Sequence, residues 1–234
     1  MDTALPLLST VVSFAFAGTV LRQYLVRRKM HQLVWCFGLV SYGIGALAEF
    51  LKGIGVWNQA VYDAWYLFGA FFVAAYLGMG TIYLMAPRRV ANLVLGLLVA
   101  LSLVAILLVA TASVDMSQVP LAARVSGKGM PNHVRLLTPI FNIFGTVALV
   151  GGAAWSAWIF WRHRAMPQRA LSNLLIAIGA LLPAIGSSLL RFDIPSLFYL
   201  FELLGVAVIF LGFLANHEIV ASRLTARPAP GRTA

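Results

Sequence analysis

Residues 90–112 read VANLVLGLLVALSLVAILLVATA, and no charged side chain lies between Arg89 and Asp115. A helix needs about 20 mostly apolar residues to cross the hydrocarbon core of a bilayer. The stretch is long enough to do so. It also lacks the alternation of apolar and polar residues that marks a β-barrel strand. It therefore predicts a membrane-spanning helix.

The whole chain has the same apolar character. Of its 234 residues, 61% are hydrophobic and 10% are charged, and the mean hydropathy is +0.90. Soluble domains carry about 25% charged residues, and they rarely expose large apolar patches. This composition excludes a soluble enzyme and a disordered tail protein. Cys36 is the single cysteine, which also excludes an internal disulfide.

We predict an all-α polytopic membrane protein with seven transmembrane helices. The apolar runs cover residues 4–24, 31–51, 60–86, 90–112, 136–161, 170–190 and 195–215. Seven spans need roughly 140 to 160 residues, so they and their loops fill a single transmembrane domain, residues 1–215. The long outer loop 113–135 is of a length that is often functional. Residues 216–234 are expected to form a short cytoplasmic tail that is disordered at its end.

The basic residues predict the orientation of the chain. With the N-terminus outside, most of the 17 Lys and Arg residues fall in inner loops, and only Glu218 of the seven acidic residues lies inside. Cytoplasmic loops of membrane proteins carry such an excess of Lys and Arg. We therefore expect a multi-pass protein of the plasma (inner) membrane with its C-terminus in the cytoplasm. The net charge of +10 then serves topology and contact with membrane lipid, not nucleic acid.

A weak internal similarity suggests a repeat. In residues 27–47 and again in 162–188, a basic loop precedes a Gly-rich helix, and an aromatic cluster opens the helix that follows each one. Parallel repeats occur in transporters. The pattern would give a 3+1+3 arrangement with the fourth span as linker, although apolar sequence also produces such similarity by chance.

Ionisable and polar side chains within the spans indicate where a site lies. Such groups are costly in lipid, so they should face the bundle interior. Counting along each span puts all of them in the outer half, where they would enclose a polar cavity that opens outward. The predicted ligand-binding residues are Glu49, Asp63, Tyr66, Asn142, Arg191, Tyr199 and Glu202.

Each of these residues also has a purely structural interpretation. Glu49 and Asp63 lie near the interface, where water can solvate them. Arg191 could pair with Glu202 only to join the last two helices. Pro183 should kink the sixth span because it removes a backbone hydrogen bond, and such a kink suits either a gate or a static bundle.

The histidines argue against several enzyme classes. His31, His163 and His217 lie at the inner boundary, and His133 lies in the outer loop. No pair faces another across the membrane core to hold haem, and the chain contains no HExxH zinc motif. We therefore predict no catalytic residues, no metal and no cofactor.

Two stretches, YLGMGTIYLMAPRR (76–89) and RLLTPIFNIFGTVALVGGA (135–153), are similar to an uncharacterised group of bacterial seven-helix membrane proteins. That similarity implies a fold and no activity. The topology also resembles opsin-like and sugar-permease-like proteins, but the last helix lacks the lysine to which opsins attach retinal. The pattern from Trp35 to Glu49 is similar to seven-helix sensor regions of bacterial histidine kinases, although these 234 residues include no kinase domain.

Three functions follow as hypotheses. The first is a small-solute or ion permease whose cavity takes a cation, amine or zwitterion. The second is a ligand-sensing or accessory subunit that acts with a separate cytoplasmic partner. The third is a lipid-handling membrane protein. A homo-oligomer is compatible with all three.

Overall fold

The computed structural model describes residues 3–162, 167–189 and 195–225, and this part of the chain is helical throughout, apart from its turns and loops. Six helical segments within it are long and apolar enough to cross a membrane. They are α1 (Ala4–Arg27), α2 (Met30–Gly53), the segment Gln59–Met85, α5 (Arg88–Ala110), the segment Asn132–Ile159, and Leu197–Ala215 of α10. The all-α class is therefore confirmed, and the six segments indicate a multi-pass membrane protein.

The expected sixth and seventh spans correspond to α9 (Pro167–Leu189) and α10 (Pro195–Thr225), which pack along each other. Within α9 the stretch Leu174–Pro183 is apolar. Helix α10 continues past residue 215 into the segment that we expected to be tail. Residues 226–234, where we expected disorder, lie outside the described residues.

Two of the spanning segments contain a π-helical stretch. Such stretches are rare and often occur at functional sites. The third span consists of α3 (Gln59–Ala64), the π-helical η1 (Trp65–Phe72) and α4 (Val73–Met85). The fifth consists of α6 (Asn132–Arg135), α7 (Leu137–Thr146), the π-helical η4 (Val147–Gly151) and α8 (Gly152–Arg162).

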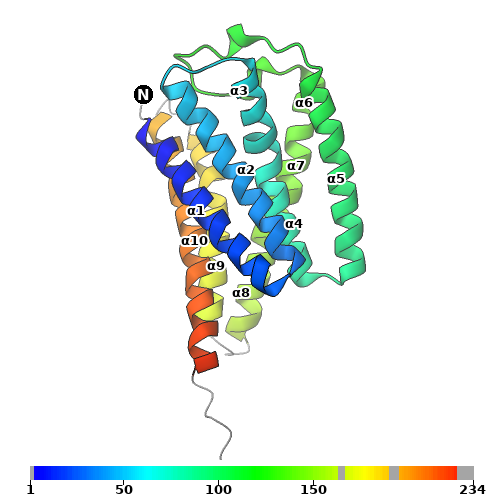
Figure 1. Cartoon of the computed structure of the whole chain (residues 1–234), viewed down its shortest axis with the longest axis vertical. Helices are drawn as coiled ribbons and strands as arrows, with labels where there is room; N and C mark the ends of the chain where they lie inside the picture. Colours follow the sequence, from blue (N-terminus) through cyan, green and yellow to red (C-terminus); the bar gives the residue numbers. More distant parts are fainter. Residues whose placement is uncertain (1–2, 163–166, 190–194, 226–234) are drawn as a thin grey trace, which may run out of the picture.

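The helices form one elongated bundle (Figure 1). The start of α1 and the segment between α5 and α6 lie at one end, which we call the loop end. The described end of α10 lies at the opposite end, the tail end. Helix α1 packs on α2 and α10, whereas α5 packs on the third span at the far side of the bundle. Only 22% of the most apolar window of α5 is buried, as suits a helix that faces lipid.

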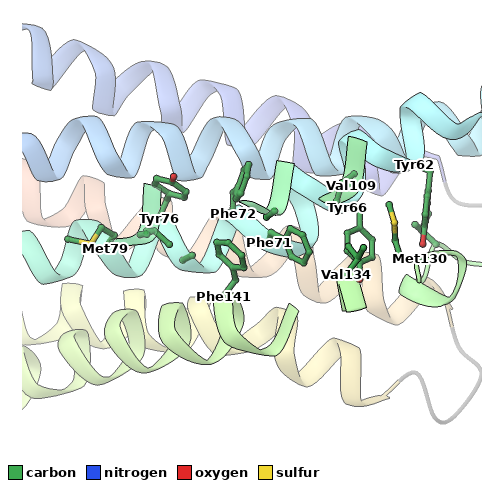
Figure 2. Packing of buried hydrophobic residues seen from close by; sticks show 14 of the residues in the cluster. Tyr62, Tyr66, Phe71, Phe72, Tyr76, Met79, Val109, Met130, Val134 and Phe141 are labelled. Atoms are coloured by element: carbon green, nitrogen blue, oxygen red, sulfur yellow. The ribbon is translucent and has the colours of Figure 1, made fainter. Parts of the chain in front are cut away.

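Aromatic side chains fill the space between the third span and its neighbours (Figure 2). Phe71 is fully buried and stacks on Phe141 of α7 with ring centroids 5.1 Å apart. A second buried cluster joins α1, α2 and α10 and includes Phe16, Leu39 and Ile209. These two clusters hold the helices around the polar residues described below.

Helices α9 and α10 approach to backbone contact. A Cβ atom added at Gly205 would lie 2.9 Å from the main-chain oxygen of Gly179, and one added at Gly179 would lie 2.8 Å from the oxygen of Gly205. Small residues allow such close packing between membrane helices. On α5, by contrast, a Cβ atom at Gly96 would meet nothing within 4 Å.

We therefore expect Gly205→Val to destabilise the bundle and Gly96→Val to leave it nearly unchanged. Overpacking a tight contact costs about 1–3 kcal/mol, and the control introduces the same β-branched side chain into a helix. Thermal unfolding of the purified protein in detergent measures the difference. An equal melting temperature for the two variants would show that the close contact does not hold α9 to α10.

Candidate functional site

A cavity of about 600 Å³ lies in the bundle towards the loop end. A volume of roughly 300–1,000 Å³ is typical of small-molecule sites. Its walls come from α2, the third span, the fifth span, α9, α10 and the segment between α5 and α6, and most of the lining is apolar. The polar side chains in the lining are Tyr42, Glu49, Trp65, Arg124, Ser126, Thr138, Asn142, Thr146 and Glu202.

Two carboxyl groups meet in this cavity, Glu49 of α2 and Glu202 of α10. The Trp65 indole Nε1 donates to Glu49 Oε1 at 3.0 Å. Glu49 Oε2 is buried and has no hydrogen-bond partner among the described residues, and Glu202 lines the same cavity and interacts with Glu49. An ionised carboxylate has no donor of its own, so the two carboxyl groups can form a hydrogen bond with each other only when one of them carries a proton.

Tyr42 fixes the position of the carboxyl pair. Its hydroxyl donates to the main-chain oxygen of Glu202 at 2.8 Å and so joins α2 to α10 at the level of the pair. Tyr199 precedes Glu202 by about one helical turn and interacts electrostatically with both glutamates. The pair is thus enclosed by side chains from both helices.

Arg124 faces the carboxyl pair from the segment between α5 and α6. Its guanidinium carbon lies 3.6 Å from the ring centroid of Phe198, which is a cation–π contact. Burial lowers the pKa of Arg124, and the charges of Glu49 and Glu202 act in the opposite direction. Arginine stays protonated at physiological pH, so Arg124 places a positive charge beside the pair.

Three side chains from the helices hold this segment by its carbonyl groups. Lys52 Nζ donates to Pro120 at 2.6 Å, Trp57 Nε1 donates to Val119 at 2.8 Å, and the Tyr62 hydroxyl donates to Ser126 at 2.9 Å. Residues 119–126 are therefore fixed at the loop end of the cavity. We call this stretch the cover segment.

Asn142 supports the cavity wall. Its side-chain nitrogen Nδ2 donates to the main-chain oxygens of Ala70 at 2.8 Å and Thr138 at 2.9 Å. The Ala70 carbonyl belongs to η1, where the π-helical geometry changes the ordinary pairing. Both N–H groups of the amide are thus used within the protein, which leaves its oxygen as the atom that can meet a solute.

At the other end the cavity stops at apolar side chains. Leu77, Leu149 and Ile209 line both this cavity and a void of about 30 Å³ that lies deeper in the bundle and has an entirely apolar lining. Those residues belong to the cluster that joins α1, α2 and α10. The polar groups described here are therefore separated from the tail end by packed side chains.

The structure brings together several of the predicted ligand-binding residues. Glu49, Asn142 and Glu202 line the cavity together with Pro183, and Tyr199 lies beside the carboxyl pair. Whether they bind a ligand stays a prediction.

Other predicted residues lie elsewhere. Tyr66 lines a neighbouring cavity of about 500 Å³, which shares Trp65 and Thr138 with the main one. Asp63 lies on α3 and is not part of the lining. Its Oδ1 is buried, and none of the residues that the structure describes forms a hydrogen bond with it. Arg191 falls outside the described residues.

Sequence reasoning missed Arg124 as part of the cavity. We placed it in the outer loop, and a single arginine in a loop gives no periodic signal of where its side chain points. Trp65 was recognised only as a member of an aromatic cluster. The indole N–H and the carboxylate of Glu49 meet because two helices cross, which residue spacing within either helix does not reveal.

No family model, curated protein or solved structure matches the chain. Among the described residues, no group of three or more His, Cys, Asp or Glu side chains could hold a metal ion.

We expect Tyr62→Phe to loosen the cover segment. The substitution removes the hydrogen bond to Ser126 and keeps the ring. A typical hydrogen bond contributes about 0.5–1.5 kcal/mol, so backbone hydrogen exchange in residues 119–130 should rise by about two- to tenfold. Tyr83→Phe is the matched control, since the Tyr83 hydroxyl donates to Asn92 away from this segment. Equal exchange in the two variants would mean that Tyr62 does not hold the segment.

Proposed function

We propose that this chain is a small-solute permease that exchanges its solute for a proton at the Glu49–Glu202 pair. The observation that carries the proposal is the contact between these two carboxyl groups inside a cavity of small-molecule size. Titratable groups buried within a membrane bundle commonly mark ion or proton pathways. A solute that displaces the shared proton would couple its own movement to that of the proton.

The arrangement of the helices supports movement around this site. Glu49 belongs to α2, which packs on α1 and the third span, whereas Glu202 belongs to α10, which packs most extensively on α9 and also on α1. The carboxyl pair therefore lies between two helices whose main packing partners differ. Pro183 lies inside α9 and lines the cavity. Proline weakens a helix at its own position, so we assign it to the hinge of a gate.

We also propose seven crossings, in which α9 spans the membrane in addition to the six segments named above, with the loop end facing outward. The end of α1, the start of α5 and the end of α8 lie towards the tail end (Figure 1). These helix ends carry Arg27, Arg88, Arg89 and Arg162. An excess of Lys and Arg is typical of the cytoplasmic side. The cavity would then take its solute from outside the cell.

A ligand sensor is the second candidate. The observation that favours it is the apolar packing of Leu77, Leu149 and Ile209, which closes the cavity towards the tail end. A sensor needs a pocket with one entrance, and the basic tail end would contact a cytoplasmic partner. Binding without solute flux would favour this function.

Transport by proteoliposomes tests the proposal. Vesicles that contain a trapped pH dye are exposed to a panel of small amines, amino acids and monovalent cations. We expect at least one solute to drive proton movement through the wild type. Since Glu202→Gln removes the exchangeable proton and one charge, that flux should fall by at least about tenfold, as expected for one charge-assisted hydrogen bond.

The comparison requires that Glu202→Gln has the same melting temperature as the wild type. Glu49→Gln is a second variant that disrupts the carboxyl pair independently. Equal proton movement in the wild type and in both variants would contradict the role of the pair. A panel that drives no proton movement through the wild type would contradict the permease itself.

A further inference from the structure

The carboxyl pair is built to receive a positive charge. Glu49 lines the cavity and is only 5% exposed. Among the described residues, no N–H group or hydroxyl donates a hydrogen bond to its Oε2. A buried carboxylate oxygen without a donor is costly. A ligand that brings an N–H donor to this atom would therefore gain more than one that brings another acceptor.

Aromatic rings surround the pair. Trp65 and Tyr42 line the cavity beside the glutamates, and Phe198 lines it beneath Arg124. Cations are attracted to the faces of such rings as well as to carboxylates. A set of carboxyl groups and aromatic rings is the combination that recognises an organic ammonium or guanidinium group.

Arg124 already interacts with both kinds of group, the carboxyl groups and an aromatic ring. Its guanidinium stacks on Phe198 and interacts with both glutamates, yet its Nε is buried and has no hydrogen-bond partner in the described part of the chain. The described hydrogen bonds that hold the cover segment act on the carbonyl groups of Val119, Pro120 and Ser126. The side chain of Arg124 can thus leave the pair while its backbone stays anchored.

We propose that the cavity binds an organic monocation with an apolar body, and that Arg124 occupies the place of that cation until the ligand binds. The proposal rests on the proposed function because it names the substrate class of the same cavity. With one shared proton the pair carries one negative charge, and Arg124 balances it. In the exchange proposed above, one proton leaves the pair as one monovalent cation enters, so the total charge of the pair and its ligand stays the same.

The rest of the cavity lining is the reason why we expect the ligand to have an apolar body. Beyond the carboxyl pair the walls are formed by small and branched apolar side chains, among them Ala70, Val73 and Val150. An inorganic cation would leave most of the 600 Å³ to water against these apolar walls. A hydrocarbon or aromatic body fills the same space favourably.

Isothermal titration calorimetry on the purified full chain tests the proposal with three probes of similar shape. Phenethylammonium carries a positive charge, phenethyl alcohol is neutral, and hydrocinnamate carries a negative charge. We expect the wild type to bind phenethylammonium at least about tenfold more tightly than either of the others, the size of one charge-assisted hydrogen bond.

Variants at Arg124 show whether this residue competes with a cationic ligand or binds the ligand. If Arg124 competes with the ligand, Arg124→Gln should tighten phenethylammonium binding by about tenfold, the effect of removing one interaction of this kind. Glu202→Gln should weaken it by at least as much. The matched control is Lys128→Gln, which removes an exposed positive charge from the same loop and should change nothing.

Three results would overturn the proposal: binding of hydrocinnamate that is lost in Arg124→Gln, equal affinity for the alcohol and the ammonium, and no binding of any probe to the wild type or to Arg124→Gln. The first would make Arg124 an anion-binding residue.

Failure of the proposed function can be distinguished from failure of this substrate assignment. Ammonium binding without flux contradicts the permease alone, and proton-coupled flux of a different solute without ammonium binding contradicts only the substrate class.

Discussion

Two carboxyl groups in the apolar interior of a helical bundle impose a constraint that the surrounding residues satisfy. An ion removed from water costs several kcal/mol unless donors and an opposite charge replace the solvent. Here Trp65 donates to Glu49, Tyr42 fixes the backbone that carries Glu202, and Arg124 supplies the positive charge. These residues come from four different parts of the chain, namely α2, η1, the cover segment and α10, and each of them compensates for the burial of the two carboxyl groups.

The meeting of Glu49 and Trp65 depends on how closely two backbones approach. A Cβ atom at Gly45 would lie 2.8 Å from the Gly69 Cα, so α2 and η1 touch there. Glu49 lies one turn beyond Gly45, and Trp65 lies one turn before Gly69 on a segment that runs the other way. The glycines therefore set the distance at which the indole reaches the carboxylate. The Ala70 carbonyl of the π-helical η1 also accepts from Asn142.

The sequence predicted the helices well because the constraint on them is local. About 20 apolar residues between charged boundaries define a span, and most of the described helices begin and end near the predicted edges, whereas α10 continues to Thr225. Position along a span follows from the rise per residue, which is why Glu49, Asn142 and Glu202 could be expected at a common depth. Asp63 shows the limit of such counting. It has the right depth but lies outside the cavity lining, because depth does not determine the direction in which a side chain points.

Arg124 could not be predicted for a different reason. Its position depends on the cover segment, and that segment is held by Lys52, Trp57 and Tyr62, whose partners are main-chain oxygens that any residue possesses. Side-chain identity in the loop therefore says little about where the loop runs. Once the segment is anchored, however, the only direction that gives Arg124 both a ring and two carboxyl groups is into the cavity. Arg124 thus both covers the site and balances the charge of the carboxyl pair. A cationic ligand that replaces Arg124 beside the pair would therefore also move the side chain that covers the site.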